Sequence, residues 1–319
     1  MRSRLFLATL AALLMWAGPA GCSPPQPPAS SLPAVPPLDP SSPGLVWRVS
    51  GGKAPFFLAG SFHLLRPDDY PLPAPYETAW QESSHLVFEI PPGGTRPGTG
   101  EALKSLLKLP SGTLETLVGP GTWQKLSEWA TKAEVAPASL QTQPPWLAAL
   151  TVALTGSRQA GFLPEHGMEA WFTQRLVGSG KTTEGLETAV GQMSLLHRLP
   201  AETQVAMLRQ ALADADSLPQ KAAVMVTAWR SGEPETLHAQ LLQSFKDFPD
   251  LRKQLINDRN AAWLPRLEIL LQSGRPTMVL VGSGHLCGPG SLVDLLEAKG
   301  YRCVQLRPSH EAILLKKAA

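Results

Sequence analysis

Two histidines near opposite ends of the chain follow the same short pattern. His63 lies in "FFLAGSFHLL" (residues 56–65) and His285 lies in "MVLVGSGHLC" (residues 278–287). In each stretch a run of apolar residues ends at Gly-Ser, and one spacer residue then precedes the histidine. Imidazole is a common ligand of divalent metals. A single histidine after a strand is typical of a turn, whereas the repeated pattern favours a shared functional role.

A carboxylate occupies a third position of the same kind, because Glu89 follows the apolar run of "HLVFEI" (residues 85–90). Open sheets gather ligand-binding groups at the carboxyl ends of their strands, and glycine there permits a sharp exit. We therefore expect the strands that end at Gly60 and Gly282 to be neighbours in one sheet. Two imidazoles and a carboxylate at one sheet edge predict a divalent-metal site. Taken alone, Glu89 would equally suit an exposed charge.

The elements that must position these residues are strands at both ends of the body. Besides the three segments above, "LVWRVS" and "RCVQLR" are short and rich in β-branched residues. Between about residues 100 and 272, apolar residues recur at three- and four-residue spacing, which is typical of helices. The pattern predicts an α+β (mixed α/β) fold, with one sheet built from N- and C-terminal strands around a long helical middle segment. Pro265 is expected to kink or break the last helix of that segment.

The N-terminal segment is typical of an exported protein. In "MRSRLFLATLAALLMWAGPAGC" (residues 1–22) two arginines precede an apolar stretch, which is too short for the ~20 residues of a membrane span. The small residues before Cys22 resemble a bacterial lipobox, so residues 1–22 are interpreted as a signal peptide with Cys22 as the lipidation site. Residues 23–44 form a Pro/Ser-rich tether, and residues 45–319 form the functional domain. We expect lipid anchoring to a membrane of the cell envelope, with a secreted or periplasmic soluble protein as the alternative.

Composition narrows the partners further. The formal charge is +2 over 319 residues, and the lysines and arginines are scattered without a basic stripe, so nucleic acid is not an expected partner. Cys287 and Cys303 bracket an expected helix between two strands. The two ends of such a crossover lie at opposite edges of a sheet, too far apart for a disulfide, so both cysteines are predicted to be reduced thiols.

Five stretches together resemble the TraB/GumN family, which is related to the Tiki metalloproteases. They are "LAGSFHLL", "LVFEI", "GLETAVGQMSLL", "NDRNAAW" and "VGSGHLCGPGSLVDLLEAKGYRCVQL", and the resemblance extends from about residue 46 to residue 306. It implies two Gly-x-x-His motifs, here residues 60–63 and 282–285, with Glu89 as the matching acid. It also implies a divalent metal (Mn, Co or Zn) held by His63, His285 and Glu89. Glu89 is expected either as a ligand or as the general base.

Three further positions follow from the resemblance. Arg259 and Asn260 match a recurring Arg-Asn pair, and an arginine at the sheet edge would bind a substrate carboxylate or stabilise developing negative charge. The alternative is an arginine on a solvated helix face. Glu187 is expected to orient one of the histidines. Glu169 stands where relatives usually have aspartate, which keeps the charge and lengthens the reach.

The leading functional hypothesis is an exported metal-dependent hydrolase that acts on a peptide or protein substrate, with catalytic residues His63, Glu89, Arg259 and His285. The alternative is a binding protein that sequesters a peptide signal or a polysaccharide fragment in the same pocket without turnover. A purely structural lipoprotein would leave the histidines dispensable. Since residues at a sheet edge contribute little to a core, their replacement is expected to leave the fold intact.

Overall fold

A computed structural model of the protein describes residues 42–93 and 99–308. Cys22 and the signal-like segment 1–22 lie outside the described residues, as does most of the tether. The described residues form one mixed sheet with strand order β4-β3-β5-β2-β1-β6. The strands are β1 (Val46–Ser50), β2 (Phe56–Ser61), β3 (His85–Phe88), β4 (Thr182–Gly185), β5 (Thr277–Gly282) and β6 (Arg302–Gln305).

The centre of the sheet confirms the expected meeting of the two chain ends. Strand β5 pairs in parallel with β2, and the register places Ser61 opposite Gly282. Strand β5 also pairs in parallel with β3, which pairs in parallel with β4. Because β5 lies between β2 and β3, the carboxyl ends of the three strands that precede His63, Glu89 and His285 are adjacent. Strand β1 runs antiparallel to both β2 and β6.

The residue types explain why these strands form the core. All six residues of β2 and all six of β5 are buried, which is the near-continuous apolar pattern of central parallel strands. Strand β4, "TTEG", is half exposed and lies at the sheet edge. It belongs to the middle segment of the chain, so the sheet includes one short strand beyond those from the two ends.

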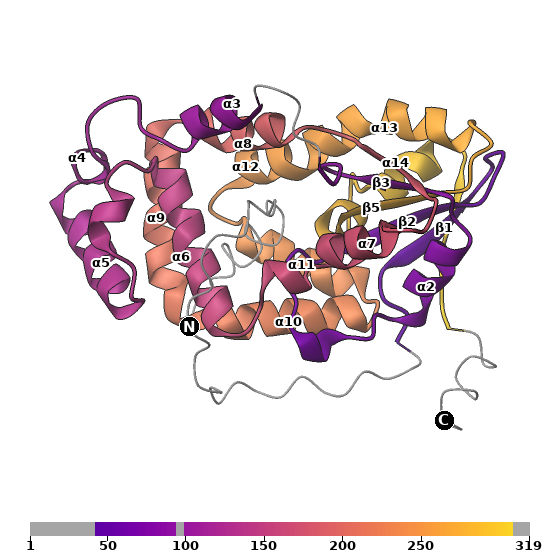
Figure 1. Ribbon diagram of the computed structural model, residues 1–319, viewed down its shortest axis with the longest axis horizontal. Coiled ribbons are helices and arrows are strands. Elements are labelled where there is room, and N and C mark those ends of the chain that lie inside the picture. The colour runs from indigo at the N-terminus through magenta and orange to yellow at the C-terminus, as the bar shows by residue number, and fades with distance from the viewer. Residues whose placement is uncertain (1–41, 94–98, 309–319) are drawn as a thin grey trace.

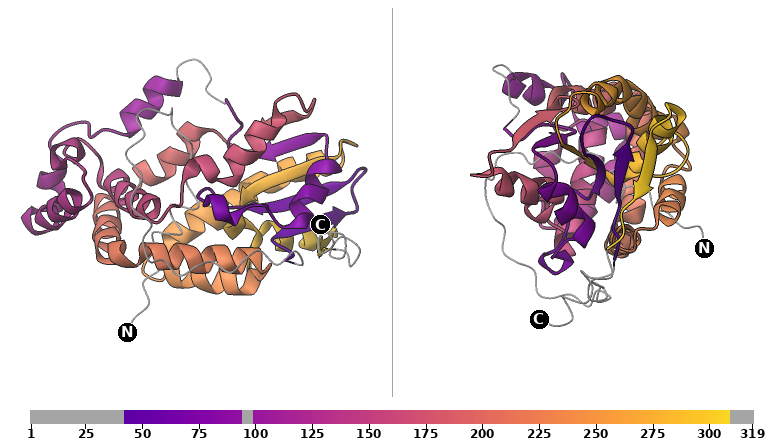
Figure 2. Two further views of the ribbon diagram at one scale, coloured as in Figure 1. Left: turned by 60° about the horizontal axis from the view of Figure 1, so that its bottom comes forward. Right: turned by 90° about the vertical axis from the view of Figure 1, so that its right-hand side faces the viewer.

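Helices fill the rest of the middle segment, as its periodicity predicted, and Figures 1 and 2 show helices on both faces of the sheet. The helices are α2 (Ala74–Gln81), α3 (Thr99–Leu106), α4 (Leu114–Val118), α5 (Pro120–Lys132), α6 (Pro145–Gln159), α7 (Met168–Leu176), α8 (Ala189–His197), α9 (Ala201–Asp214), α10 (Leu218–Arg230), α11 (Pro234–Ser244), α12 (Pro249–Arg252), α13 (Asp258–Leu271) and α14 (Leu292–Ala298). In Figure 1, α4 and α5 lie at the end of the molecule opposite the sheet.

Helix α13 continues through Pro265, so the expected break does not occur, while the expected kink stays a prediction. Proline removes one backbone donor, but Trp263 and Leu267 on either side of it are buried and hold the helix against the core. A π-helical segment, Lys253–Asn257, leads directly into α13. Wide turns of this kind are frequent at functional sites, and here the turn is followed at once by Arg259 and Asn260.

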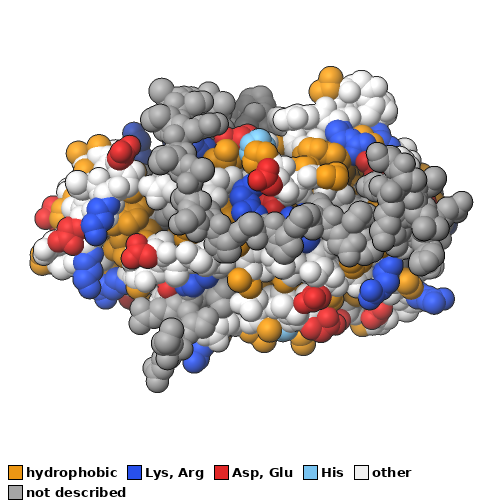
Figure 3. Space-filling model, turned by 90° about the horizontal axis from the view of Figure 1, so that it is seen from below, with side chains coloured by type: hydrophobic (Ala, Val, Ile, Leu, Met, Phe, Trp, Pro, Cys, Tyr) orange, Lys and Arg blue, Asp and Glu red, His pale blue; other side chains and the backbone are white. Residues whose placement is uncertain are grey.

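Two further expectations concern the chemistry of the surface and the thiols. Among the described residues Cys287 and Cys303 are both unpaired, and burial raises the pKa of each thiol above its ordinary value. Figure 3 shows one face of the molecule, on which acidic and basic side chains are interspersed. Within residues 42–93 and 99–308, no helix is both long and apolar enough to cross a membrane.

Candidate functional site

The two Gly-Ser motifs interlock at the carboxyl ends of β2 and β5. The Ser283 hydroxyl donates to the carbonyl of Ser61 at 3.0 Å. A Cβ atom on Gly60 would lie 2.8 Å from the Ser283 hydroxyl oxygen and 3.2 Å from the Cβ of Leu45. Only glycine therefore permits this approach of the two chain segments. The glycine of the first motif and the serine of the second thus pack against each other at the sheet edge to which both histidines lead.

Glu89 is the anion at the centre of the cluster. Its Oε1 accepts from the Gly282 N–H at 2.7 Å, and its Oε2 accepts from Gln192 at 3.1 Å and pairs with the Arg259 guanidinium. Oε1 also lies 3.7 Å from Nε2 of His285. Burial alone would raise the pKa of Glu89, but Arg259 and the two imidazoles, His285 and His63, hold it well below its ordinary value. Glu89 is therefore ionised although it is almost fully buried.

The guanidinium of Arg259 is the cation that balances this charge. A guanidinium has five N–H donors in a fixed plane, and each of the five has a partner here. The side chain is 5% exposed, so the alternative of a solvated helix face is wrong. Nε and Nη2 both donate to Glu187, Nη2 also donates to Glu89, and Nη1 donates to the Leu255 carbonyl at 2.9 Å and to His285 Nε2 at 3.0 Å.

The protonation of His285 follows from the groups around its ring. The Asn260 amide nitrogen donates to the carbonyls of His285 and Gly290, so its oxygen faces the ring, 2.6 Å from Nδ1. Nδ1 therefore carries the proton, and Nε2 keeps a lone pair that accepts from Arg259. Burial and Arg259 lower the pKa of His285 far below its ordinary value. The imidazole is neutral at physiological pH, with Nε2 as its single ligand atom.

Removing the Asn260 amide is expected to destabilise the protein without touching the ion pairs. Asn260→Ala leaves the buried Nδ1–H of His285 and two carbonyls unpaired, which should lower the free energy of unfolding by about 2–4 kcal/mol in urea denaturation. The matched control is Asn257→Ala, because the bond that Asn257 donates to the Pro289 carbonyl is long, at 3.4 Å, and lies at an exposed position. Its expected cost is below about 1 kcal/mol. Equal costs for the two variants would contradict the role assigned to Asn260.

His63 is paired with an acid that sequence reasoning did not place. Helix α7 begins directly beside His63, because a Cβ on Gly167 would lie 2.1 Å from the His63 carbonyl oxygen. The first turn of α7 carries Glu169, whose Oε1 lies 3.0 Å from His63 Nδ1 and also accepts from the Ser61 hydroxyl. Burial lowers the pKa of His63, but Glu169 and Glu89 outweigh it and raise the pKa above its ordinary value. The signal in the sequence was the acidic position in "PEHGMEAWF".

Two side chains after β4 complete the cluster, and one of them departs from expectation. Glu187 was expected to orient a histidine, but its carboxylate binds Arg259 and accepts from Gln192 at 3.0 Å. Burial raises the pKa of Glu187 above its ordinary value, as does the neighbouring charge of Glu89. Gln192, on α8, bridges Glu187 and Glu89 through its amide nitrogen. Its position within the matched "GLETAVGQMSLL" was the available signal for this role.

The site is more deeply buried than strand ends were expected to be. His285 has no exposed surface, and Glu89 and His63 are 6% and 7% exposed. The expectation that edge residues contribute little to burial is therefore wrong. The helices α7, α8 and α13 cover the carboxyl ends of the strands through the contacts of Glu169, Gln192 and Arg259.

The side chains of His63, Glu89 and His285 offer atoms of the types that bind a divalent metal. The guanidinium of Arg259 lies between two of them and keeps them apart. Imidazole nitrogen and carboxylate oxygen suit Mn²⁺, Co²⁺ and Zn²⁺. Both ring nitrogens of His63 are buried without a hydrogen bond among the described residues, and Nδ1 lies 3.0 Å from Glu169 Oε1, so Nε2 would offer a lone pair to a ligand once the ring has lost its second proton. No three His, Cys, Asp or Glu side chains of the described chain stand at metal-ligand spacing, and the guanidinium of Arg259 lies between Glu89 and His285.

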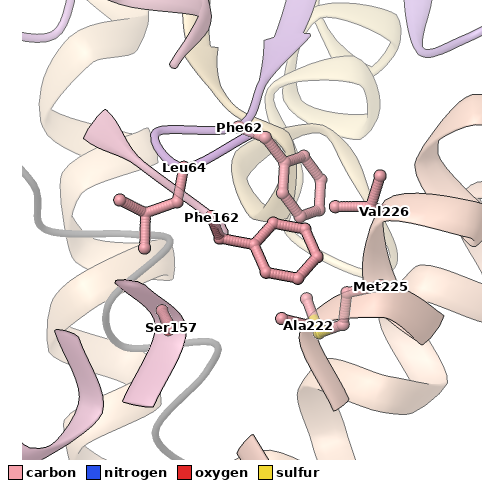
Figure 4. A pocket seen from close by; sticks show the side chains of 7 residues that line it. All are labelled: Phe62, Leu64, Ser157, Phe162, Ala222, Met225 and Val226. Carbon is pink, nitrogen blue, oxygen red and sulfur yellow. The ribbon is translucent and has the colours of Figure 1, made fainter. Parts of the chain in front are cut away.

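Neither of two hollows elsewhere in the molecule includes the clustered residues. A cavity of about 20 Å³, shown in Figure 4, has an almost entirely apolar lining that includes Phe62 and Leu64, the neighbours of His63 in sequence. It has room for about one water molecule. A larger open groove of about 740 Å³ lies between α5 and α9 and includes Trp129 and Arg209. His63, Glu89 and His285 line neither.

Comparison with known proteins gives one match. A family model described as the TraB/PrgY/gumN family matches residues 45–305, which covers nearly all of the described chain. No curated protein and no solved structure matches. The match includes all of the residues clustered at the carboxyl ends of β2, β3 and β5.

Proposed function

Because the chain belongs to the TraB/PrgY/gumN family, we propose that it is a metal-dependent hydrolase, most simply a peptidase, with its site at the carboxyl ends of β2, β5 and β3. One observation carries the proposal. Three adjacent strands deliver His63, His285 and the ionised Glu89 to one buried cluster. A buried carboxylate and a neutral imidazole with a directed lone pair are costly to maintain, and such groups concentrate at functional sites.

The residues of the cluster have two proposed tasks, to bind the metal and to orient its ligands. His63 and His285 would hold a Mn²⁺, Co²⁺ or Zn²⁺ ion through Nε2, together with Glu89, and such an ion makes a bound water nucleophilic and polarises a carbonyl. Asn260 holds the His285 ring in the tautomer that leaves Nε2 unprotonated. Glu169, 3.0 Å from His63 Nδ1, would favour a proton on that nitrogen, and metal binding at Nε2 would displace the second proton that the raised pKa favours. Each histidine thus has one nitrogen fixed by the protein and one directed to the site.

The two carboxylates on Arg259 suit different roles. The pKa of Glu89 is held low, so it is a weak base and is better suited as a ligand. The pKa of Glu187 is raised, and with 16% of its side chain exposed it is the more accessible of the two. Glu187 would accept the water proton through a carboxylate lone pair beyond those that Arg259 and Gln192 occupy. Of the two roles that the sequence analysis left open for Glu89, metal ligand and general base, this assignment favours the metal ligand.

Metal content tests the proposal without knowledge of the substrate. The purified chain, dialysed against Mn²⁺, Co²⁺ or Zn²⁺ and then against metal-free buffer, should retain about one ion per molecule of the preferred metal. His63→Ala should retain almost none while remaining folded by circular dichroism. His197→Ala, which alters a histidine at the end of α8, is the matched control and should retain the ion. Equal retention by the His63→Ala variant would contradict the proposal.

A binding protein without turnover is the second candidate, and the depth of the site favours it. Because His285 is fully buried and all five donors of Arg259 are engaged, little reactive surface faces solvent. Such a protein would sequester a peptide signal or a polysaccharide fragment. It predicts that peptides incubated with the metal-loaded chain are bound and recovered intact.

The proposed location is the cell envelope, with Cys22 as a lipid-modified anchor to the membrane. Cys22→Ser should then move the protein from the membrane fraction to the soluble fraction of the expressing cells, because the tether alone has no affinity for lipid. Fractionation followed by immunoblotting measures the shift, and Cys303→Ser is the control that should stay in the membrane fraction. Unchanged membrane retention of the Cys22→Ser variant would contradict lipid anchoring.

A further inference from the structure

Arg259 and a metal ion would both need the same lone pair, that on Nε2 of His285. The proton on Nδ1 of His285 is committed to Asn260, so Nε2 is the only nitrogen of that ring able to bind a cation. In the structure this lone pair accepts an N–H of Arg259 at 3.0 Å. A nitrogen lone pair cannot accept a hydrogen bond and bind a metal at the same time. The contact between Arg259 and His285 therefore excludes a metal bound to His285.

The same guanidinium also covers the carboxylates. Arg259 donates to Glu89 and twice to Glu187, so it neutralises the anions that a divalent ion would neutralise. Its single charge is shared between these two carboxylates, and its Cζ atom lies 4.6 Å from the ring centre of Trp263. Without a cation at this position, two carboxylates bridged by one amide would repel each other in a buried setting.

We propose that Arg259 is an internal cation that competes with the metal, so that metal binding requires it to release His285 and Glu89. This inference rests on the proposed metal dependence. We call the required release of His285 and Glu89 by Arg259 the gate. Release is compatible with the fold because both contacts to Glu187 can persist, one from Nε and one from Nη2. Arg259 thus closes the metal-free site and sets the affinity of the site for metal.

The gate predicts that removing the guanidinium strengthens metal binding. Arg259→Met should bind Co²⁺ at least about tenfold more tightly than the unaltered chain, which is the effect of a single and a double charge ~5 Å apart even at the dielectric constant of water. Titration of the metal-free protein with Co²⁺, followed by visible absorption, measures the affinity without any substrate. Arg266→Met is the matched control, because Arg266 lies on the same helix and pairs with Glu184 at the surface.

A second variant tests mutual exclusion directly. Arg259→Ala removes the guanidinium together with the methylenes beyond Cβ, which leaves room for a guanidinium ion. At low millimolar concentration this ion should occupy the space and weaken Co²⁺ binding to the variant. The same concentration should leave Co²⁺ binding to the unaltered chain and to Arg266→Met unchanged. Arg259→Lys keeps the charge but lacks the planar set of donors, and its Co²⁺ affinity should lie between those of the unaltered chain and Arg259→Met.

The outcomes separate this inference from the proposed function. If the unaltered chain binds Co²⁺ and the folded Arg259→Met binds it no more tightly, the gate is wrong while metal dependence stands. If neither binds Co²⁺, Mn²⁺ or Zn²⁺, both the gate and the proposed metal dependence are overturned. If Arg259→Met and Arg259→Ala do not fold, Arg259→Lys decides, and an affinity equal to or below that of the unaltered chain overturns the gate.

Discussion

Replacing His63 by alanine is expected to lower metal-stimulated peptide hydrolysis by at least about a thousandfold, because the metal loses a ligand and the water it activates. His285→Ala should have a similar effect. His63 is almost buried but makes its polar contacts mainly with Glu169, so its variant should fold. His285 is fully buried, so the rate of its variant must be measured well below the midpoint of its thermal unfolding.

The combination of the two changes tests whether the histidines act as one unit. The double variant His63→Ala with His285→Ala should be hardly slower than either single variant, because one removal already destroys the shared nucleophile. Initial rates with and without added metal measure this, and His197→Ala is the control of unchanged rate. Multiplicative losses would show two independent sites and contradict the shared metal.

Glu89→Gln is expected to be the most destabilising conservative change in the site. It removes the buried anion that pairs with Arg259 and leaves the guanidinium with Glu187 alone, which should lower the free energy of unfolding by about 3 kcal/mol or more. Urea denaturation followed by circular dichroism measures the loss.

The matched control for this change is Glu82→Gln. Glu82 pairs with Arg48 at 2.7 Å, but both side chains are more than a third exposed, so the expected loss is below about 1 kcal/mol. If the loss for Glu89→Gln were as small, burial of the ion pair would contribute little and the cluster would be looser than its contacts indicate.

The convergence of His63, Glu89 and His285 was predictable from sequence because it depends on local signals alone. Apolar runs that end in glycine mark buried parallel strands, and the carboxyl ends of such strands share an edge of the sheet. The same reasoning placed the two Gly-Ser motifs on adjacent strands. The close approach of Ser283 to Gly60 accounts for the glycine of the first motif and the serine of the second.

The partners of these residues were not predictable in the same way. Arg259, Gln192 and Glu169 lie on three different helices, and no periodicity indicates which helix end will cover the sheet. Strand β4 has only a weak strand signal in the sequence, because "TTEG" pairs along one side only and has no apolar run. The burial of His63, Glu89 and His285 was not predicted either, because the helices that cover them could not be identified from the sequence. Strand ends are exposed in an isolated sheet and become buried only when helices dock on them.

Cleavage of an unbiased peptide library is the most direct test of the central claim that His63, Glu89 and His285 form a metal-dependent hydrolytic site. The unaltered chain and folded His285→Ala are incubated with the library and Mn²⁺, Co²⁺ or Zn²⁺, and the products are identified by mass spectrometry. We predict cleavage by the unaltered chain with at least one of these metals, its loss on chelation, and none with His285→Ala. Near-normal metal-stimulated cleavage by folded His285→Ala, or intact peptides in every incubation, would contradict the claim.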